Sequence, residues 1–205
     1  MRTGTKKKLS RQNESARKRE LMLDVASTCF GELGYKATTT REIARRSGVS
    51  DGLLFAHFAS KEALFEAAVE QVLAHWWDMT QDILDATPDV IDALEKLFRA
   101  GFEFAARSPL YLALRRHEGA PTPRLKTAIT EANRRWLQQL ADLLRQGQIK
   151  GEIRRDLDTA SAADLLNELQ ITYTTRRMGL GMPLPDAMTD TLLQFMKNGL
   201  TPTNS

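Results

Sequence analysis

Side chains that act as nucleophiles, general bases or metal ligands are scarce in this 205-residue chain. It has one cysteine, Cys29, and three histidines, His57, His75 and His117. His75 and Asp78 could share one face of a helix, but two side chains do not make a metal site. No phosphate-binding glycine loop, HExxH, CxxC or GxSxG motif is present. The sequence therefore predicts a protein that is not an enzyme and has no metal or cofactor.

Basic side chains are concentrated at the front of the chain. Residues 1–61 contain 13 Lys/Arg and six Asp/Glu, whereas residues 62–205 contain 16 and 20. Residues 1–12, MRTGTKKKLSRQ, have almost no apolar content, so we expect a disordered basic arm there. A basic N-terminal segment followed by a mildly acidic remainder of the chain indicates one module that binds a polyanion such as nucleic acid. A solvated tail with no partner is the other interpretation of the arm.

The stretch SGVSDGLLFAHFASKE, residues 47–62, combines a turn with helix-capping residues. Gly48 can adopt a left-handed backbone conformation at low cost and so turn the chain. Thr38-Thr39-Thr40 before it and Ser50 after it supply hydroxyls that cap helix N-termini. Two short helices joined by a tight glycine-bearing turn are typical of the helix-turn-helix motif. The second helix, beginning near Ser50, suits the DNA major groove, which is about 12 Å wide.

Apolar residues recur at helical spacing through the rest of the chain. A first helix is expected from Asn13 to a stop at Gly34, and a long one over residues 61–84. Prolines then divide the chain into helical blocks at residues 89–106, 109–117, 124–147, 159–179 and 186–198. No segment alternates as a half-buried strand does. The pattern predicts an all-α fold of about nine helices.

Membrane insertion and secretion find no support in the sequence. The longest apolar runs have four to five residues, too few to span a bilayer. No apolar stretch follows the basic N-terminus, as a secretory signal would require. A single cysteine excludes an internal disulfide and favours a reducing compartment. We expect a cytoplasmic protein with no membrane partner.

The segment from Arg17 to Phe65 resembles the DNA-binding domain of the TetR family of bacterial transcriptional regulators. The residues that carry the resemblance are Leu23-Asp24-Val25-Ala26, Phe30, Gly34, Thr38-Thr39-Thr40, Glu42-Ile43-Ala44, Gly48-Val49-Ser50, Gly52, Leu54-Phe55, His57-Phe58 and Lys61-Glu62-Ala63-Leu64. The rest of the chain agrees with the family only in length and helical layout. The resemblance implies a three-helix helix-turn-helix domain at residues 13–60. A larger helical effector-binding and dimerisation domain would follow at 61–205, with 61–84 as the connecting helix.

The family's DNA-contacting positions can be carried over one residue at a time. Thr40 and Arg41 look like contacts to the DNA backbone, and His57 and Lys61 match positions that hold phosphate. The positions where the family reads base edges, or packs against them, are Ser50, Asp51, Gly52 and Leu53.

Two residues of this segment depart from the family pattern. Phe55, which is also among the predicted DNA-contacting positions, stands where a tyrosine is common, so a hydroxyl-to-phosphate hydrogen bond is lost there. Asp51 puts a carboxylate at the groove-facing end of its helix. It could accept a hydrogen bond from a cytosine amino group, or it could only stabilise the helix N-terminus.

The family also implies a dimer interface and an effector pocket in the remaining helices. The interface would be a four-helix bundle of the last two helices, 159–179 and 186–198, with Leu165, Leu169, Leu192, Phe195 and Met196. The pocket would gather Phe102, Leu112, His117, Trp136, Tyr173 and Arg176, since apolar cavities with a few polar groups bind small ligands. Ordinary core packing is the alternative for each of these side chains.

The predicted function is that of a sequence-specific DNA-binding transcriptional regulator. Its partners would be a palindromic double-stranded DNA operator, a second copy of the chain, and a small, largely apolar effector that releases it as a repressor. A ligand-independent architectural or replication-associated protein with the same DNA reader is the alternative.

Overall fold

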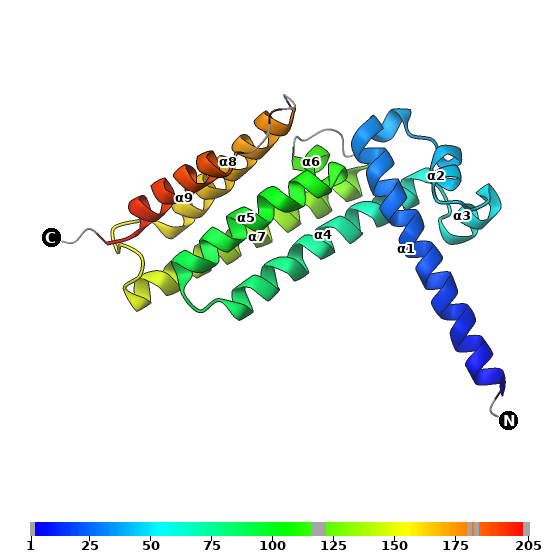
Figure 1. Cartoon of the computed structure of the whole chain (residues 1–205), viewed down its shortest axis with the longest axis horizontal. Helices are drawn as coiled ribbons and strands as arrows, with labels where there is room; N and C mark the ends of the chain where they lie inside the picture. Colours follow the sequence, from blue (N-terminus) through cyan, green and yellow to red (C-terminus); the bar gives the residue numbers. More distant parts are fainter. Residues whose placement is uncertain (1–2, 116–121, 180–181, 183–184, 203–205) are drawn as a thin grey trace. The chain divides into compact units, whose positions relative to one another are not determined.

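The computed structural model describes residues 3–115, 122–179, 182 and 185–202, and every regular element in them is a helix (Figure 1). The helices are α1 (Thr3–Ala37), α2 (Thr40–Arg46), α3 (Asp51–His57), α4 (Lys61–Ala86), α5 (Val90–Arg107), α6 (Pro109–Arg115), α7 (Pro123–Lys150), α8 (Thr159–Gly179) and α9 (Asp186–Leu200). The predicted all-α fold is confirmed, with nine helices in these ranges. None of them combines the length and the apolar character that a membrane span requires.

The first helix begins earlier than the sequence predicts. Residues 3–12, expected to be a disordered arm, form the first turns of α1. Lys, Arg, Gln and Glu favour helix, and a helix held by packed residues further along extends at little cost per residue. Residues 12–20 are all exposed. At the other end, Gly34 has φ 77° and ψ 162°, which interrupts α1 at the expected stop.

The chain divides into two compact units, which differ from the predicted domains. Unit 1 comprises residues up to Ala74 together with Ser108–Pro121, and unit 2 comprises His75–Arg107 and Thr122–Ser205. The long helix α4 therefore belongs to unit 1 in its first half and to unit 2 in its second. The packing boundary lies inside α4, whereas the sequence places a functional boundary between residues 60 and 61.

Unit 1 is held together by an apolar core shared among α1, α2, α3 and α4. Phe30 of α1 stacks edge-on against Phe65 of α4, with ring centroids 4.7 Å apart. Ile43 of α2 and Leu54 of α3 are fully buried, as is Ala44, whose small side chain allows α2 and α3 to approach. This core is what orients the helix-turn-helix.

The helix α6 joins unit 1 through a close approach at Gly31. A Cβ built on Gly31 would lie 2.3 Å from the backbone nitrogen of Leu110 and 2.3 Å from the carbonyl carbon of Pro109. Only a glycine lets the two backbones come this near. Leu110 and Tyr111 of α6 are buried in consequence.

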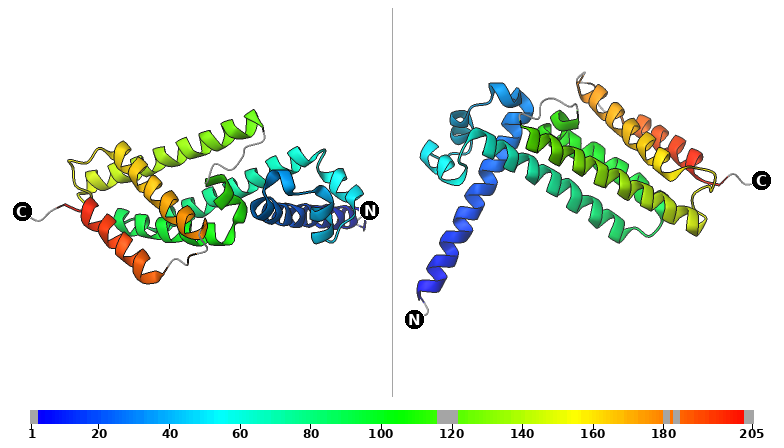
Figure 2. Two further views of the ribbon diagram at one scale, coloured as in Figure 1. Left: turned by 90° about the horizontal axis from the view of Figure 1, so that it is seen from above. Right: turned by 180° about the vertical axis from the view of Figure 1, so that it is seen from behind.

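Unit 2 is a helical bundle in which α5 and α8 pack against each other and against α7, and α9 packs on α5 (Figure 2). Its core contains two aromatic pairs. Trp76 meets Trp136 with ring centroids 5.4 Å apart, and Phe102 meets Tyr173 at 5.4 Å. The first pair joins α4 to α7, and the second joins α5 to α8.

Candidate nucleic-acid interface

Local hydrogen bonds set the beginning and end of α2 and α3. The Glu42 N–H donates to the Thr39 hydroxyl at 3.2 Å, and the Leu53 N–H donates to the Ser50 hydroxyl at 3.2 Å. Between them Gly48 takes φ 67°, and the Val49 N–H donates to the Ala44 carbonyl at 3.0 Å. Capping hydroxyls satisfy donors that a helix N-terminus leaves free. The turn is thus built from residue types that the sequence shows directly.

Burial of one side of α3 determines which side faces outward. Leu54 and Phe58 are buried in unit 1, and Arg19 of α1 lies with its guanidinium carbon 5.2 Å from the Phe58 ring centre. The exposed residues of α3 and its cap are Ser50, Asp51, Gly52, Phe55 and Ala56. Leu53 and His57 are half-buried. Most of the DNA-contacting positions predicted on this helix and its cap are therefore exposed, including Phe55.

The predicted phosphate contacts outside α3 occupy different environments. Arg41 is exposed and Thr40 is half-buried. Lys61 is tied back: its Nζ donates to the Lys36 carbonyl at 3.4 Å and lies 4.5 Å from the centre of the Tyr35 ring. The sequence suggests a mobile charge at Lys61, whereas the structure gives it two partners. A phosphate would have to compete with a cation–π contact worth about 0.5–1 kcal/mol.

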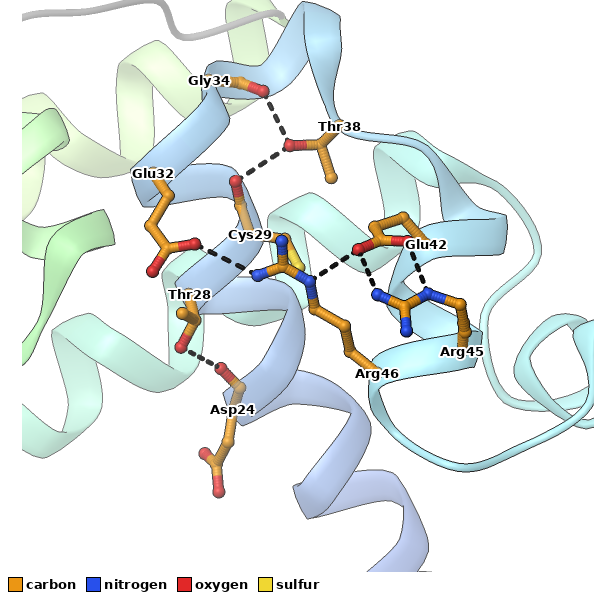
Figure 3. A network of polar contacts seen from close by, with 9 residues as sticks. All are labelled: Asp24, Thr28, Cys29, Glu32, Gly34, Thr38, Glu42, Arg45 and Arg46. Atoms are coloured by element: carbon orange, nitrogen blue, oxygen red, sulfur yellow. Dashed lines mark hydrogen bonds and ion pairs between the residues drawn. The ribbon is translucent and has the colours of Figure 1, made fainter.

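An ion-pair network on α2 was not predicted from the sequence (Figure 3). The Glu42 carboxylate accepts from Arg45 at 2.9 and 2.8 Å and from Arg46 at 2.7 Å. Hydrogen bonds from Arg45, then from Arg46, lower the pKa of Glu42 to about 2. Arg46 also donates to Glu32 of α1 at 3.1 Å. The i, i+3 and i, i+4 spacing on α2 was a usable signal, but the bond to Glu32 was not visible in sequence.

The end of α1 is held by Thr38, close to this network (Figure 3). Its hydroxyl lies within hydrogen-bond distance of the carbonyls of Cys29 at 3.0 Å and Gly34 at 2.8 Å. Thr38 and Cys29 are both fully buried. Burial raises the pKa of the Cys29 thiol. Cys29 is a packed apolar residue rather than a reactive one.

The residues predicted to form an effector pocket are brought together only in part. Phe102 contacts Tyr173, whereas Trp136 contacts Trp76. Leu112 lies in unit 1, Arg176 is exposed on α8, and His117 falls outside the described residues. Two buried polar atoms of this set, Trp136 Nε1 and Tyr173 Oη, have no hydrogen-bond partner.

A groove of about 850 Å³ lies between the second half of α4 and α7, within unit 2. Trp77, Leu84 and Leu143 are apolar residues along it. The charged residues along it are Arg134, Arg135, Lys150, Asp85, Glu131 and Asp142. The Arg135 guanidinium carbon sits 3.5 Å from the Trp77 ring centre. Gln139 also lines the groove, and its Oε1 is buried without a hydrogen-bond partner.

The residues predicted at a dimer interface differ in how exposed their side chains are. Leu165 is 71% exposed, Leu169 42% and Phe195 73%, although all three are large and apolar. Leu192 is half-buried. Met196 is instead buried within unit 2, because it lies one residue beyond Phe195 and so about 100° around the helix. Met196 therefore belongs to the core of the unit rather than to the predicted interface.

Residues 22–68 match the family model of bacterial regulatory proteins, tetR family. The chain is 33% identical over 140 residues to the HTH-type transcriptional repressor KstR2 of Mycobacterium tuberculosis, covering 67% of this chain and 70% of KstR2. It is 28% identical over 166 residues to the HTH-type transcriptional regulator UidR of Escherichia coli, covering 79% and 81%.

Two solved structures extend the likeness over nearly the whole chain. The ketosteroid transcriptional regulator KstR2 of M. tuberculosis superposes with a TM-score of 0.71 at 29% identity, covering 90% of this chain and 95% of that one. FadR of Bacillus subtilis, solved in complex with stearoyl-CoA, has a TM-score of 0.75 at 19% identity, covering 88% and 98%. At that identity the likeness to FadR concerns the fold alone.

Proposed function

The chain belongs to the TetR family of bacterial transcriptional regulators, and we propose that it is a homodimeric repressor released from a palindromic operator by a largely apolar effector. It is a helix-turn-helix DNA-binding protein and not an enzyme. The observation that carries the proposal is α3, capped at Ser50, buried along Leu54 and Phe58, and exposed along its other side. That side enters the major groove, and Arg41, His57 and Lys61 contact phosphates beside it.

Dimer formation through α8 and α9 is supported by their exposed apolar residues. Leu165 and Leu169 stand one helical turn apart on α8, and Phe195 stands two turns from Met188 on α9. Exposed apolar area of this kind is the usual sign of a protein interface. Pairing doubles the contact set, because two recognition helices then read half-sites about 34–36 Å apart.

The groove between α4 and α7 is our candidate for the effector site. Trp77, Leu84 and Leu143 would contact an apolar body, while Arg134 and Lys150 would receive an anionic end. The buried oxygen of Gln139 is a hydrogen-bond acceptor with no partner, so a ligand that supplies a donor removes a cost. KstR2 is described as a ketosteroid regulator and FadR was solved with stearoyl-CoA. By analogy we propose a lipophilic acid or its thioester.

Release from DNA would pass through α4. This helix is continuous from Lys61 to Ala86, and its two halves belong to different units. An effector that binds one position of α4 better than another shifts the population of that position. A displaced α4 would change the spacing of the two α3 helices in the dimer. A coupling of about 1–3 kcal/mol gives a 5- to 150-fold loss of operator affinity.

The test begins with the full-length protein and a pool of random duplex DNA. Selection of bound fragments should yield a palindrome, and footprinting should place protein on the major groove of both half-sites. Fatty acids, steroid acids and their thioesters are then added, with melting temperature and operator affinity as readouts. A bound palindrome that none of these compounds releases would favour the alternative, a ligand-independent DNA-binding protein. Failure to select any DNA would overturn the proposal itself.

A further inference from the structure

The exposed side of α3 has none of the side chains that make paired hydrogen bonds to bases. Its sequence, Asp51–His57, contains no Arg, Lys, Asn or Gln. Arg and Lys are the usual partners of guanine in the major groove, and Asn and Gln are those of adenine. The polar side chains of α3 are the exposed Asp51 carboxylate, which accepts hydrogen bonds but cannot donate them, and the half-buried His57 imidazole at the C-terminal end of the helix.

The centre of this exposed side is small and apolar. Gly52 and Ala56 lie one helical turn apart, directly opposite the buried Leu54 and Phe58. A Cβ built on Gly52 would meet no atom within 4 Å, so nothing of the protein covers this part of the helix. With so little side chain in the way, the α3 backbone can approach the base edges closely.

Phe55 lies beside this small centre and is 48% exposed. It is one turn from Asp51 on the same side of α3, and no ring contact of Phe55 is found among the aromatic pairs of the described residues. An exposed phenylalanine on a DNA-facing helix offers apolar area and no hydrogen bond. The group of the major groove that matches this chemistry is the C5 methyl of thymine.

The exposed arginines of the helix-turn-helix domain lie on elements other than α3. Arg41 and Arg45 of α2 are exposed, and Arg17 and Arg19 are exposed on α1. Phosphate contacts from such residues hold the protein on DNA without reading its sequence. The arginines that can hold phosphate are therefore separate from the exposed side of α3.

We propose that α3 selects its operator mainly through thymine methyl groups that contact Phe55 and Ala56, with a hydrogen-bond donor of a neighbouring cytosine or adenine facing Asp51. The inference rests on the proposed role of α3 as the groove-reading helix. It specifies which chemical groups of the bases this helix recognises. Operator half-sites should accordingly contain at least one thymine whose methyl is essential and no guanine that is read by α3.

The test uses the full-length protein and its selected operator, with each thymine replaced in turn by deoxyuridine. This change removes one methyl and leaves base pairing intact. Loss of one buried methyl should weaken binding about fourfold at the critical position in each half-site. Phe55→Ala should weaken binding to the thymine operator by more, and it should make the protein indifferent to the uridine change. Phe55→Leu, which keeps apolar area, should retain part of the discrimination.

The outcomes separate this inference from the proposed function. If the operator is bound and footprinted but no uridine substitution matters, methyl reading is wrong while the reader role of α3 stands. The same conclusion follows if Phe55→Ala weakens both operators equally. In the converse experiment, guanines of the operator are replaced by 7-deazaguanine. A large loss of binding affinity on replacement of a guanine that faces α3 would show guanine recognition and overturn the inference. Melting temperatures of both variants confirm folding, since Phe55 is not in the core.

Discussion

The guanidinium of Arg46 on α2 donates to the carboxylate of Glu32 on α1 at 3.1 Å. Its Nε is also held by Glu42 at 2.7 Å, and Glu42 holds Arg45 as well. Two basic residues of the helix-turn-helix thus have carboxylate partners before DNA arrives. Exposed ion pairs of this kind contribute only about 0–1 kcal/mol, so a DNA phosphate can compete for these arginines.

Replacement of Glu42 by Gln should raise DNA affinity, because it removes a carboxylate that occupies Arg45 and Arg46. Each arginine that gains a phosphate contact should steepen the dependence of log K on log salt concentration by about 0.9. Fluorescence anisotropy with labelled operator over a salt series measures both. Glu103→Gln on α5 is the matched control, since it removes the same charge from an exposed ion pair, with Arg107, in unit 2. If both substitutions change the DNA affinity and its salt dependence equally, the effect of Glu42→Gln does not come from the release of Arg45 and Arg46.

The Glu42 network also predicts how unit 1 responds to acid. The folded pKa of Glu42 is lowered from 4.5 to about 2, first by the hydrogen bond from Arg45. A lowered pKa means that the contribution to stability is present above about pH 4.5 and is lost as the pH falls towards 2. Between about pH 5 and pH 3 the melting temperature of the parent protein should fall more than that of Glu42→Gln. If the melting temperatures of the two proteins fall equally over this pH range, the prediction is wrong.

Deletion of residues 1–12 should weaken DNA binding on all sequences alike. The deleted segment contains five basic residues, Arg2, Lys6, Lys7, Lys8 and Arg11. Each phosphate contact that is lost should reduce the salt slope by about 0.9. Affinities for operator and for unrelated duplex DNA at several salt concentrations measure this. An unchanged salt slope would mean that the arm does not touch DNA.

Phe195→Asp should convert the dimer into a monomer while the chain stays folded, because the side chain is 73% exposed in a single copy. A charge placed in an apolar interface loses its hydration without a partner. Sedimentation measures the mass, and the palindromic operator should then be bound far more weakly. Ile149→Asp is the control, since Ile149 is 77% exposed on α7, outside α8 and α9. A dimer that survives Phe195→Asp would place the interface elsewhere.

Gly31→Ala should destabilise unit 1 by about 1–3 kcal/mol, as overpacking of a close contact does. The new methyl would lie 2.3 Å from the backbone of Leu110, so α6 would have to move away from α1. Gly52→Ala is the matched control in a helix, because its Cβ would meet no atom within 4 Å. Thermal unfolding of the two variants should show a lowered melting temperature for Gly31→Ala and no decrease for Gly52→Ala. Similar melting temperatures would show that α6 yields freely.

Short-range signals were sufficient to predict the helices and the turn, apart from the start of α1 at Thr3. Thr39 and Ser50 cap α2 and α3, Gly34 interrupts α1, and Gly48 turns the chain, all as expected. Each of these signals acts between residues that are close together along the chain, so the sequence alone is enough to recognise it. The resemblance to the TetR family rests on this same segment, and residue types and their spacing were therefore enough to reveal it.

Contacts between distant residues could be decided only by the tertiary structure. Helical periodicity could not say that Met196 is buried while Phe195 is exposed, since both lie on an apolar helix whose neighbours were unknown. The bond from Arg46 to Glu32, the tether of Lys61 to Lys36 and the closeness of Gly31 to α6 have the same origin. They depend on how helices cross and at what distance, and that geometry is a property of the packed unit rather than of any one helix.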